Sequence, residues 1–103
     1  MGSHVRNYYL KNHSRKEAKG IIEEIMKDTV NEYGPEVYLG PNSIGDKIHK
    51  KTGERGEESY ISPPLVRGLL DEMVDEEKVE RAFRLREHYR REPVKVPLYR
   101  LKK

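Results

Sequence analysis

The sequence has 103 residues, of which 34% are hydrophobic and 38% are charged, and its formal net charge is +3 at pH 7. A chain of this length forms one domain with a modest core, since small domains bury only roughly two-thirds of their unfolded surface. The absence of cysteine excludes disulfide frameworks and thiolate metal sites, and no apolar run is long enough for a signal peptide or a membrane span. These features predict a soluble, cytoplasmic protein, and the abundance of Lys, Glu and Arg is typical of a thermophile, such as an archaeon.

Residues 1–13 are predicted to form an N-terminal arm ahead of a single domain, residues 14–103. The start Gly2-Ser3-His4 is typical of an expression-tag remnant and takes no part in the fold prediction. The arm then carries three adjacent large side chains, Tyr8, Tyr9 and Leu10. Such a cluster is unusual on a polar surface, so it either folds back on its own domain or packs on a second copy. We favour the second, which makes a homodimer.

The clearest element is a helix between Ser14 and Gly34. Ser14 and Glu17 match a capping box, in which each side chain satisfies an otherwise unpaired backbone N–H. Apolar residues at three- and four-residue spacing predict one buried face. These residues are Ala18, Ile21, Ile22, Ile25, Met26, Val30 and Tyr33. Gly34 followed by Pro35 ends the helix.

A short strand and a second helix are predicted next. The strand, Val37–Leu39, is β-prone and is bounded by a proline and a glycine. The segment "PNSIGDKIHKKTG" predicts a short helix that is capped by Asn42 or Ser43, faces Ile44 and Ile48 inward and ends at Gly53. Its outer side carries three lysines that are candidate binding residues, Lys47, Lys50 and Lys51.

A third helix is predicted to begin at Pro63-Pro64. Proline is favourable at the first helical position because its missing N–H has no partner there, and Ser62 before it suits the N-cap. The predicted buried stripe is Leu65, Val66, Leu69, Leu70, Met73 and Val74. The start of the helix presents Tyr60, Ser62 and Arg67, whereas the acids Asp71, Glu72, Asp75, Glu76 and Glu77 lie in its second half and at its end.

The last segment predicts a β-hairpin. "VERAFRLREHY" and "PVKVPLYRL" alternate partly with period two, and a polar tip near Arg90–Pro93 separates them. A rival interpretation prolongs the third helix to about residue 92, because "DEEKVERAFRLREHYRRE" is rich in helix formers. Leu85 breaks that helical stripe, whereas Phe83 and Leu85 suit one face of a strand. We therefore favour the hairpin.

Charge is unevenly distributed along the chain. Residues 81–103 hold nine Lys and Arg against two Glu, while residues 54–80 hold nine acids against three Lys and Arg. This segregation predicts a polyanionic partner that is met mainly by the hairpin; the alternative is a solvated surface whose two halves attract each other. The candidate contacts on the hairpin are Arg84, Arg86, His88, Arg90, Arg91 and Lys95.

The order of these elements resembles the winged helix-turn-helix family, in the style of small bacterial and archaeal regulators of the MarR or PadR type. The likeness is carried by "SIGDKIHKKTG", "SPPLVRGLLDEMVDEEKVER" and "VPLYRLKK", whereas "TGERGEESYI" is longer than the turn of the simplest members. The resemblance implies an α+β fold of three helices with a small antiparallel β-sheet or β-hairpin wing. It also implies that the third helix enters the major groove and meets the bases with its N-terminal part.

We expect sequence-specific binding of double-stranded DNA, as a homodimer, in transcription regulation or DNA organisation. Two alternatives stay open: a protein–protein interaction module that uses the acidic residues 54–80, and a winged helix that binds RNA or the ribosome. No nucleophile elbow or phosphate loop occurs, and the four histidines are too widely spaced for a metal site. We therefore expect no enzyme activity, no metal and no cofactor.

Overall fold

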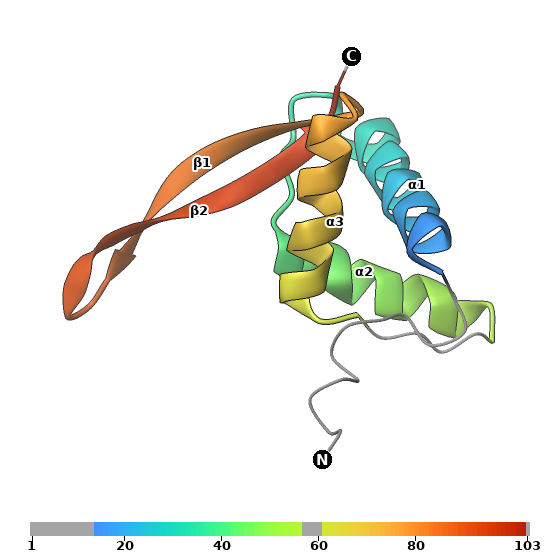
Figure 1. Ribbon diagram of the computed structural model, residues 1–103, viewed down its shortest axis with the longest axis horizontal. Helices are drawn as coiled ribbons and strands as arrows, with labels where there is room; N and C mark the ends of the chain where they lie inside the picture. The colour runs from blue at the N-terminus through green and yellow to red at the C-terminus, as the bar shows by residue number, and fades with distance from the viewer. Residues whose placement is uncertain (1–13, 57–60, 103) are drawn as a thin grey trace.

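The computed structural model describes residues 14–56 and 61–102, apart from the side chain of His88. Its elements are α1 (Arg15–Tyr33), α2 (Pro41–Glu54), α3 (Pro63–Asp75), β1 (Val79–His88) and β2 (Arg91–Leu101). The three helices pack together, and the two strands form an antiparallel hairpin that extends away from them (Figure 1). This is the α+β, winged-helix arrangement that the sequence predicted.

Helix α1 has the predicted ends. The Ser14 hydroxyl accepts a hydrogen bond from the Glu17 N–H at 3.1 Å, and the Glu17 carboxylate accepts one from the Ser14 N–H at 2.7 Å, which completes the capping box. Gly34 ends the helix with a φ of 97°, a conformation that glycine adopts without strain. Tyr33 was predicted to face the core but is exposed, because it is the last residue of the helix and lies beyond the packed region.

Helix α2 begins earlier than predicted. Gly40 is its N-cap and Pro41 its first residue, so the predicted caps Asn42 and Ser43 lie inside the first turn. The reason is the one that applies to Pro63: proline fits the first helical position, where its missing N–H has no partner. At the other end the helix continues one residue past Gly53.

The predicted strand Val37–Leu39 is reduced to a single bridge. Leu39 pairs with Tyr99 of β2 through two backbone hydrogen bonds, of 2.7 and 2.8 Å. The segment is too short to form a ladder, but the bridge fixes the entry of α2 against the base of the hairpin.

The core lies where the three helices meet the hairpin's base. Ser62 is the N-cap of α3 and Pro63 and Pro64 follow it, as predicted. The stripe on α3 packs against apolar residues of the other two helices and against the first residue of β1 and Tyr99 of β2. Fully buried members include Ile22, Met26, Ile44, Ile48, Val66, Leu69, Leu70, Met73 and Tyr99.

The hairpin interpretation is confirmed and the long third helix is wrong. Glu77, at a φ of 61°, turns the chain out of α3. The Glu77 and Lys78 N–H groups donate to the carbonyls of Val74 and Met73, which is the pattern of a Schellman motif. The turn of the hairpin is at Tyr89 and Arg90, slightly earlier than the predicted tip.

A buried tyrosine ties the base of the hairpin to α3. The Tyr99 hydroxyl donates to Oδ1 of Asp71 at 2.6 Å, and Nη1 of Arg81 donates to the same oxygen at 2.9 Å. Burial, and then the hydrogen bond to Asp71, raise the pKa of Tyr99 to about 12. The phenol is therefore a neutral donor at ordinary pH, and it fixes the angle between α3 and the hairpin.

Removing the Tyr99 hydroxyl tests its contribution to the link between the hairpin and α3. Tyr99→Phe is expected to lower the free energy of unfolding by about 1 kcal/mol, the typical net contribution of one hydrogen bond. Arg81 keeps the Asp71 carboxylate partnered, so the loss stays modest. Urea unfolding measures it, with Tyr89→Phe as the control because Tyr89 is 93% exposed. An unchanged stability for Tyr99→Phe would show that the bond to Asp71 contributes nothing.

Candidate nucleic-acid interface

A groove of about 590 Å³ lies between the hairpin and the N-terminal ends of α2 and α3. Three arginines line it: Arg67 from α3, and Arg84 and Arg86 from β1. No carboxylate is found among the described residues that line it. Around the arginines the lining is apolar or uncharged, and consists of Gly40, Pro41, Asn42, Ser43, Pro63, Pro64, Val96, Pro97 and Leu98.

Local structure explains how the arginines converge. Arg84 and Arg86 are two residues apart on one strand, so both side chains point to the same face of the hairpin. Arg67 lies one turn after Pro63 on α3 and is exposed. The three guanidinium groups therefore come from two elements that Tyr99 holds together at a fixed angle.

The start of α2 adds positive potential to the same groove. Asn42 and Ser43 line it within the first turn of the helix, and the first intrahelical hydrogen bond runs from Ile44 N to Gly40 O. The N–H groups ahead of that bond have no intrahelical acceptor, and the helix dipole is positive at this end. The predicted N-cap, Asn42 or Ser43, lies two or three residues after the observed one, so this helix end was not among the predicted site features; the preference of proline for the first helical position, used for Pro63, identifies Pro41 as well.

Further basic residues lie at the hairpin tip, beyond the groove. Arg90, Arg91 and Lys95 are exposed, and the Arg90 guanidinium lies over the Tyr89 ring at 5.3 Å from its centroid. His88 belongs to β1, and its side chain lies outside the described residues.

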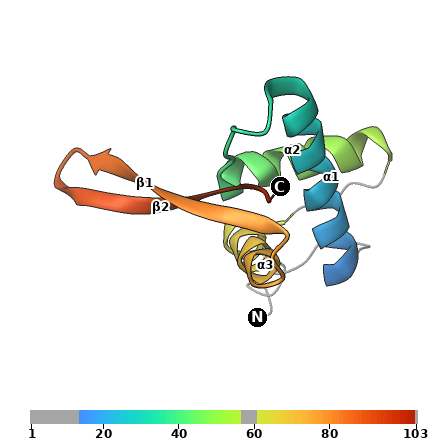
Figure 2. The ribbon, with the colours of Figure 1, turned by 90° about the horizontal axis from the view of Figure 1, so that it is seen from above.

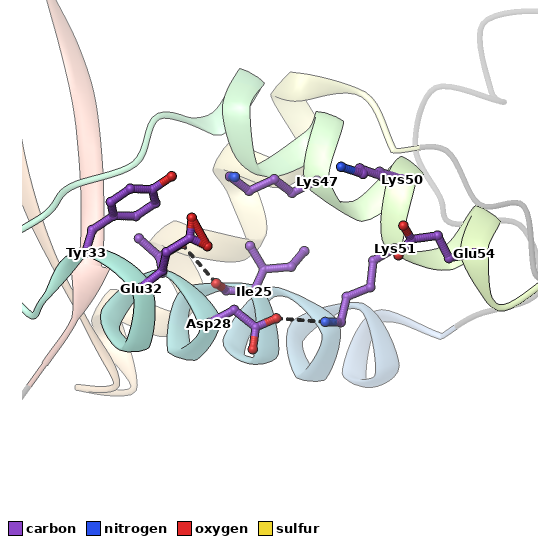
Figure 3. Close-up of a pocket in the computed structure, with 9 residues that line it drawn as sticks. Ile25, Asp28, Glu32, Tyr33, Lys47, Lys50, Lys51 and Glu54 are labelled. Atoms are coloured by element: carbon purple, nitrogen blue, oxygen red, sulfur yellow. Dashed lines mark hydrogen bonds and ion pairs between the residues drawn. The ribbon is translucent and has the colours of Figure 1, made fainter.

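The three lysines of α2 lie elsewhere. Lys47, Lys50 and Lys51 line a smaller hollow of about 160 Å³ between α1 and α2, on the side of α2 that faces α1 (Figure 3). Three carboxylates share that hollow, those of Asp28, Glu32 and Glu54, and Lys51 Nζ is 2.8 Å from Oδ2 of Asp28. The structure does not bring these lysines together with the arginine groove.

Of the other residues predicted to contact DNA or a second copy, only some lie in the described part of the chain. Ser62 is buried at the start of α3, so we leave it out of the interface and assign it a capping position only. Tyr60 and the proposed dimer residues Tyr8, Tyr9 and Leu10 lie outside the described residues. Arg67 is the predicted α3 contact that lines the groove.

The acids of α3 are directed away from the groove. Glu72 forms ion pairs with Arg15 and Lys19 of α1, and Lys19 also reaches Oε2 of Glu76 at 2.8 Å. Asp71 is occupied by Tyr99 and Arg81 as described. A helix with so many carboxylates can therefore sit beside a polyanion, because its acidic side faces α1 and the hairpin base.

The ion pairs make stability depend on pH. The hydrogen bond from Lys19 holds the pKa of Glu72 below its usual value of 4.5. A lowered folded-state pKa gives stability that is fully present above 4.5 and is lost as the pH falls through the folded value. We expect the free energy of unfolding to drop between neutral pH and a pH of about 3. The drop should be smaller in Glu72→Gln, measured by urea unfolding at both pH values; an identical drop would contradict this role for Glu72.

Within residues 14–56 and 61–102, no group of three His, Asp or Glu side chains is placed to hold a metal ion. No helix among the described residues has the length and apolar character needed to cross a membrane. Comparison with protein-family models, with curated proteins and with solved structures found no match for this chain.

Proposed function

We propose that this protein binds double-stranded DNA through the arginine groove and the hairpin. The observation that carries the proposal is the convergence of Arg67, Arg84 and Arg86 on one groove whose described lining contains no carboxylate. Arginine forms bidentate hydrogen bonds with phosphate and with guanine, and phosphate contacts supply most of the sequence-independent affinity for DNA. In this role the start of α3 faces the major groove, and the hairpin follows the backbone.

The start of α2 supports a phosphate contact beside the arginines. Helix N-termini bind anions because their free N–H groups and their dipole favour negative charge. Pro63 and Pro64 supply no N–H at the start of α3, so α2 rather than α3 provides this kind of contact. The exposed Arg90, Arg91 and Lys95 extend the phosphate contacts towards the hairpin tip.

The protein–protein alternative is less well supported. It relied on the acidic residues 54–80 as an exposed interface, but Asp71, Glu72 and Glu76 are already paired within the domain. Double-stranded DNA binding as a homodimer, in transcription regulation or DNA organisation, therefore remains the function that we propose.

We assign the recognition of the DNA base sequence to Arg67. It is the basic side chain that the first half of α3 directs into the groove. A bidentate arginine–guanine contact contributes roughly 1–3 kcal/mol of discrimination between base pairs. Arg67→Ala is therefore expected to weaken binding to the best site selected from random duplexes by about 5- to 150-fold. Its effect on arbitrary duplexes should be much smaller. An equal loss on both would make Arg67 a phosphate contact without a role in specificity.

The proposal is tested by measuring the affinity of the full chain for duplex DNA and for a structured RNA hairpin at two salt concentrations. We expect tighter binding to the duplex and a linear decrease of log K with log salt, at about 0.9 per phosphate contacted. Lys47→Ala/Lys50→Ala is the matched control, since it removes two positive charges from the hollow between α1 and α2 instead of the groove. Tighter binding to RNA, or no binding to either, would contradict the proposal.

A further inference from the structure

The hairpin ends in a turn of two residues, Tyr89 and Arg90, because His88 of β1 pairs with Arg91 of β2. Figures 1 and 2 show that this turn is the part of the hairpin farthest from the helices. Two-residue hairpin turns favour Asn and Gly, which adopt a positive φ easily, but neither Tyr89 nor Arg90 has a positive φ. Turn geometry therefore does not account for an aromatic residue and a cation at these two positions.

The Tyr89 ring is open to a ligand from outside the domain. Tyr89 is 93% exposed, which makes it the most exposed large apolar residue in the described part of the chain. The Arg90 guanidinium lies over one face of the ring, at 5.3 Å from its centroid, so the other face remains free.

The ring also continues the line of basic side chains that begins in the groove. Arg86 lines the groove, and Tyr89 follows it by three residues, which is roughly 10 Å along a strand. Successive nucleotides of one DNA strand are about 3.4 Å apart along the helix axis. A DNA strand that contacts Arg86 and follows the hairpin therefore passes Tyr89 about three nucleotides further on. Arg91 and Lys95, which are exposed on β2, add positive charge at this end.

An exposed aromatic ring beside an arginine suits a nucleobase. Aromatic side chains stack on bases of any sequence, and arginine adds a cation–π contribution. Inside an intact duplex the bases are stacked on each other, so a ring that enters must first unstack a base step. A base that is already unpaired presents its face without most of that cost. The hairpin tip is therefore better suited to an unpaired base than to a paired one.

We propose that Tyr89 stacks on an unpaired base of DNA, and that the protein binds a duplex that continues into a single strand more tightly than one paired throughout. The duplex lies against the arginine groove, and the single strand passes the hairpin tip. There Arg91 contacts its phosphates, and Arg90 covers the face of the Tyr89 ring that the base does not. This inference rests on the proposed DNA binding and specifies the form of DNA that the same interface takes.

The test compares two duplexes of the same sequence, one fully paired and one with a short single-stranded overhang. We expect the full chain to bind the overhang duplex more tightly, and Tyr89→Ala to weaken that binding by about 5- to 150-fold, the range for one aromatic–base stack. Its effect on the fully paired duplex should be much smaller. Tyr89→Phe keeps the ring and should bind like the wild type.

The matched control is Tyr33→Ala, which removes an exposed tyrosine from the hollow between α1 and α2 and should not change either affinity. Circular dichroism checks that each variant is folded. A 2-aminopurine base in the overhang reports the stack directly, because its fluorescence falls when an aromatic ring stacks on it. The wild type and Tyr89→Phe should quench it, and Tyr89→Ala should leave it close to that of free DNA.

Three outcomes would overturn the inference and leave the proposed DNA binding in place. They are equal affinity of the wild type for the two duplexes, an overhang affinity that Tyr89→Ala does not change, and equal losses from Tyr89→Ala on both duplexes. A loss in Tyr89→Phe as large as in Tyr89→Ala would also overturn it, since the hydroxyl and not the ring would then make the contact. Failure to bind either duplex would contradict the proposed function and this inference together.

Discussion

Replacing Arg84 and Arg86 together with alanine is expected to lower the affinity for duplex DNA roughly a hundredfold. Hydrogen bonds to charged groups contribute about 1.5–3 kcal/mol each, so the loss of one guanidinium–phosphate contact costs about tenfold or more. The slope of log K against log salt should fall by about 1.8, since each lost phosphate contact flattens it by about 0.9. Both side chains are exposed on the hairpin, so the fold should be unaffected.

The control for this prediction is Lys47→Ala/Lys50→Ala, which removes the same number of charges. These lysines share their hollow with three carboxylates and lie away from the groove. We expect only a small change in affinity from them, because exposed charges act weakly beyond about 8–10 Å at physiological salt. Equal losses in the two double variants would show that net charge, and not the groove, determines binding.

Leu70→Ala is expected to lower the free energy of unfolding by about 2–5 kcal/mol. Leu70 is fully buried on α3, where it belongs to the cluster that joins all three helices to the base of the hairpin. Truncation removes its transfer free energy and leaves a cavity. Because the free energy of unfolding of a small domain is only about 5–15 kcal/mol in total, this single change should remove a large part of it.

Leu65→Ala is the matched comparison, with the same chemistry on the same helix. Leu65 is only partly buried against the core, so we expect a clearly smaller loss, of about 1 kcal/mol. Urea unfolding of both variants measures the difference. Similar losses would indicate that α3 packs differently from the arrangement described here.

Local signals were sufficient for most of the fold. The capping box at Ser14 and Glu17, the glycine at position 34 and the apolar spacing along α1 are all short-range patterns, and each is seen in the structure. The alternation of Phe83 and Leu85 with Arg84 and Arg86 distinguished a strand from a helix. The end of α3 gave no such signal, because the residue in the left-handed conformation is Glu77 and not the glycine usual there.

The site depends on packing, which spacing along the chain does not show. Lys47, Lys50 and Lys51 were predicted on the outer side of α2, but α2 packs on α1 so that they line a hollow with three carboxylates. The ion pairs of Glu72 also depend on packing, because its partners Arg15 and Lys19 are more than fifty residues away in the sequence. Sequence reasoning could name the charged side chains, whereas only the fold shows which of them share a surface.

The most direct measurement is an amide NMR titration of the full chain with a short duplex at moderate salt. DNA binding through the arginine groove predicts that the largest shift changes occur at Asn42, Ser43 and Arg67 and along Arg84–Arg86, with only small changes at Asp28 and Lys51. Changes concentrated in the hollow between α1 and α2, or absent at saturating duplex, would contradict it.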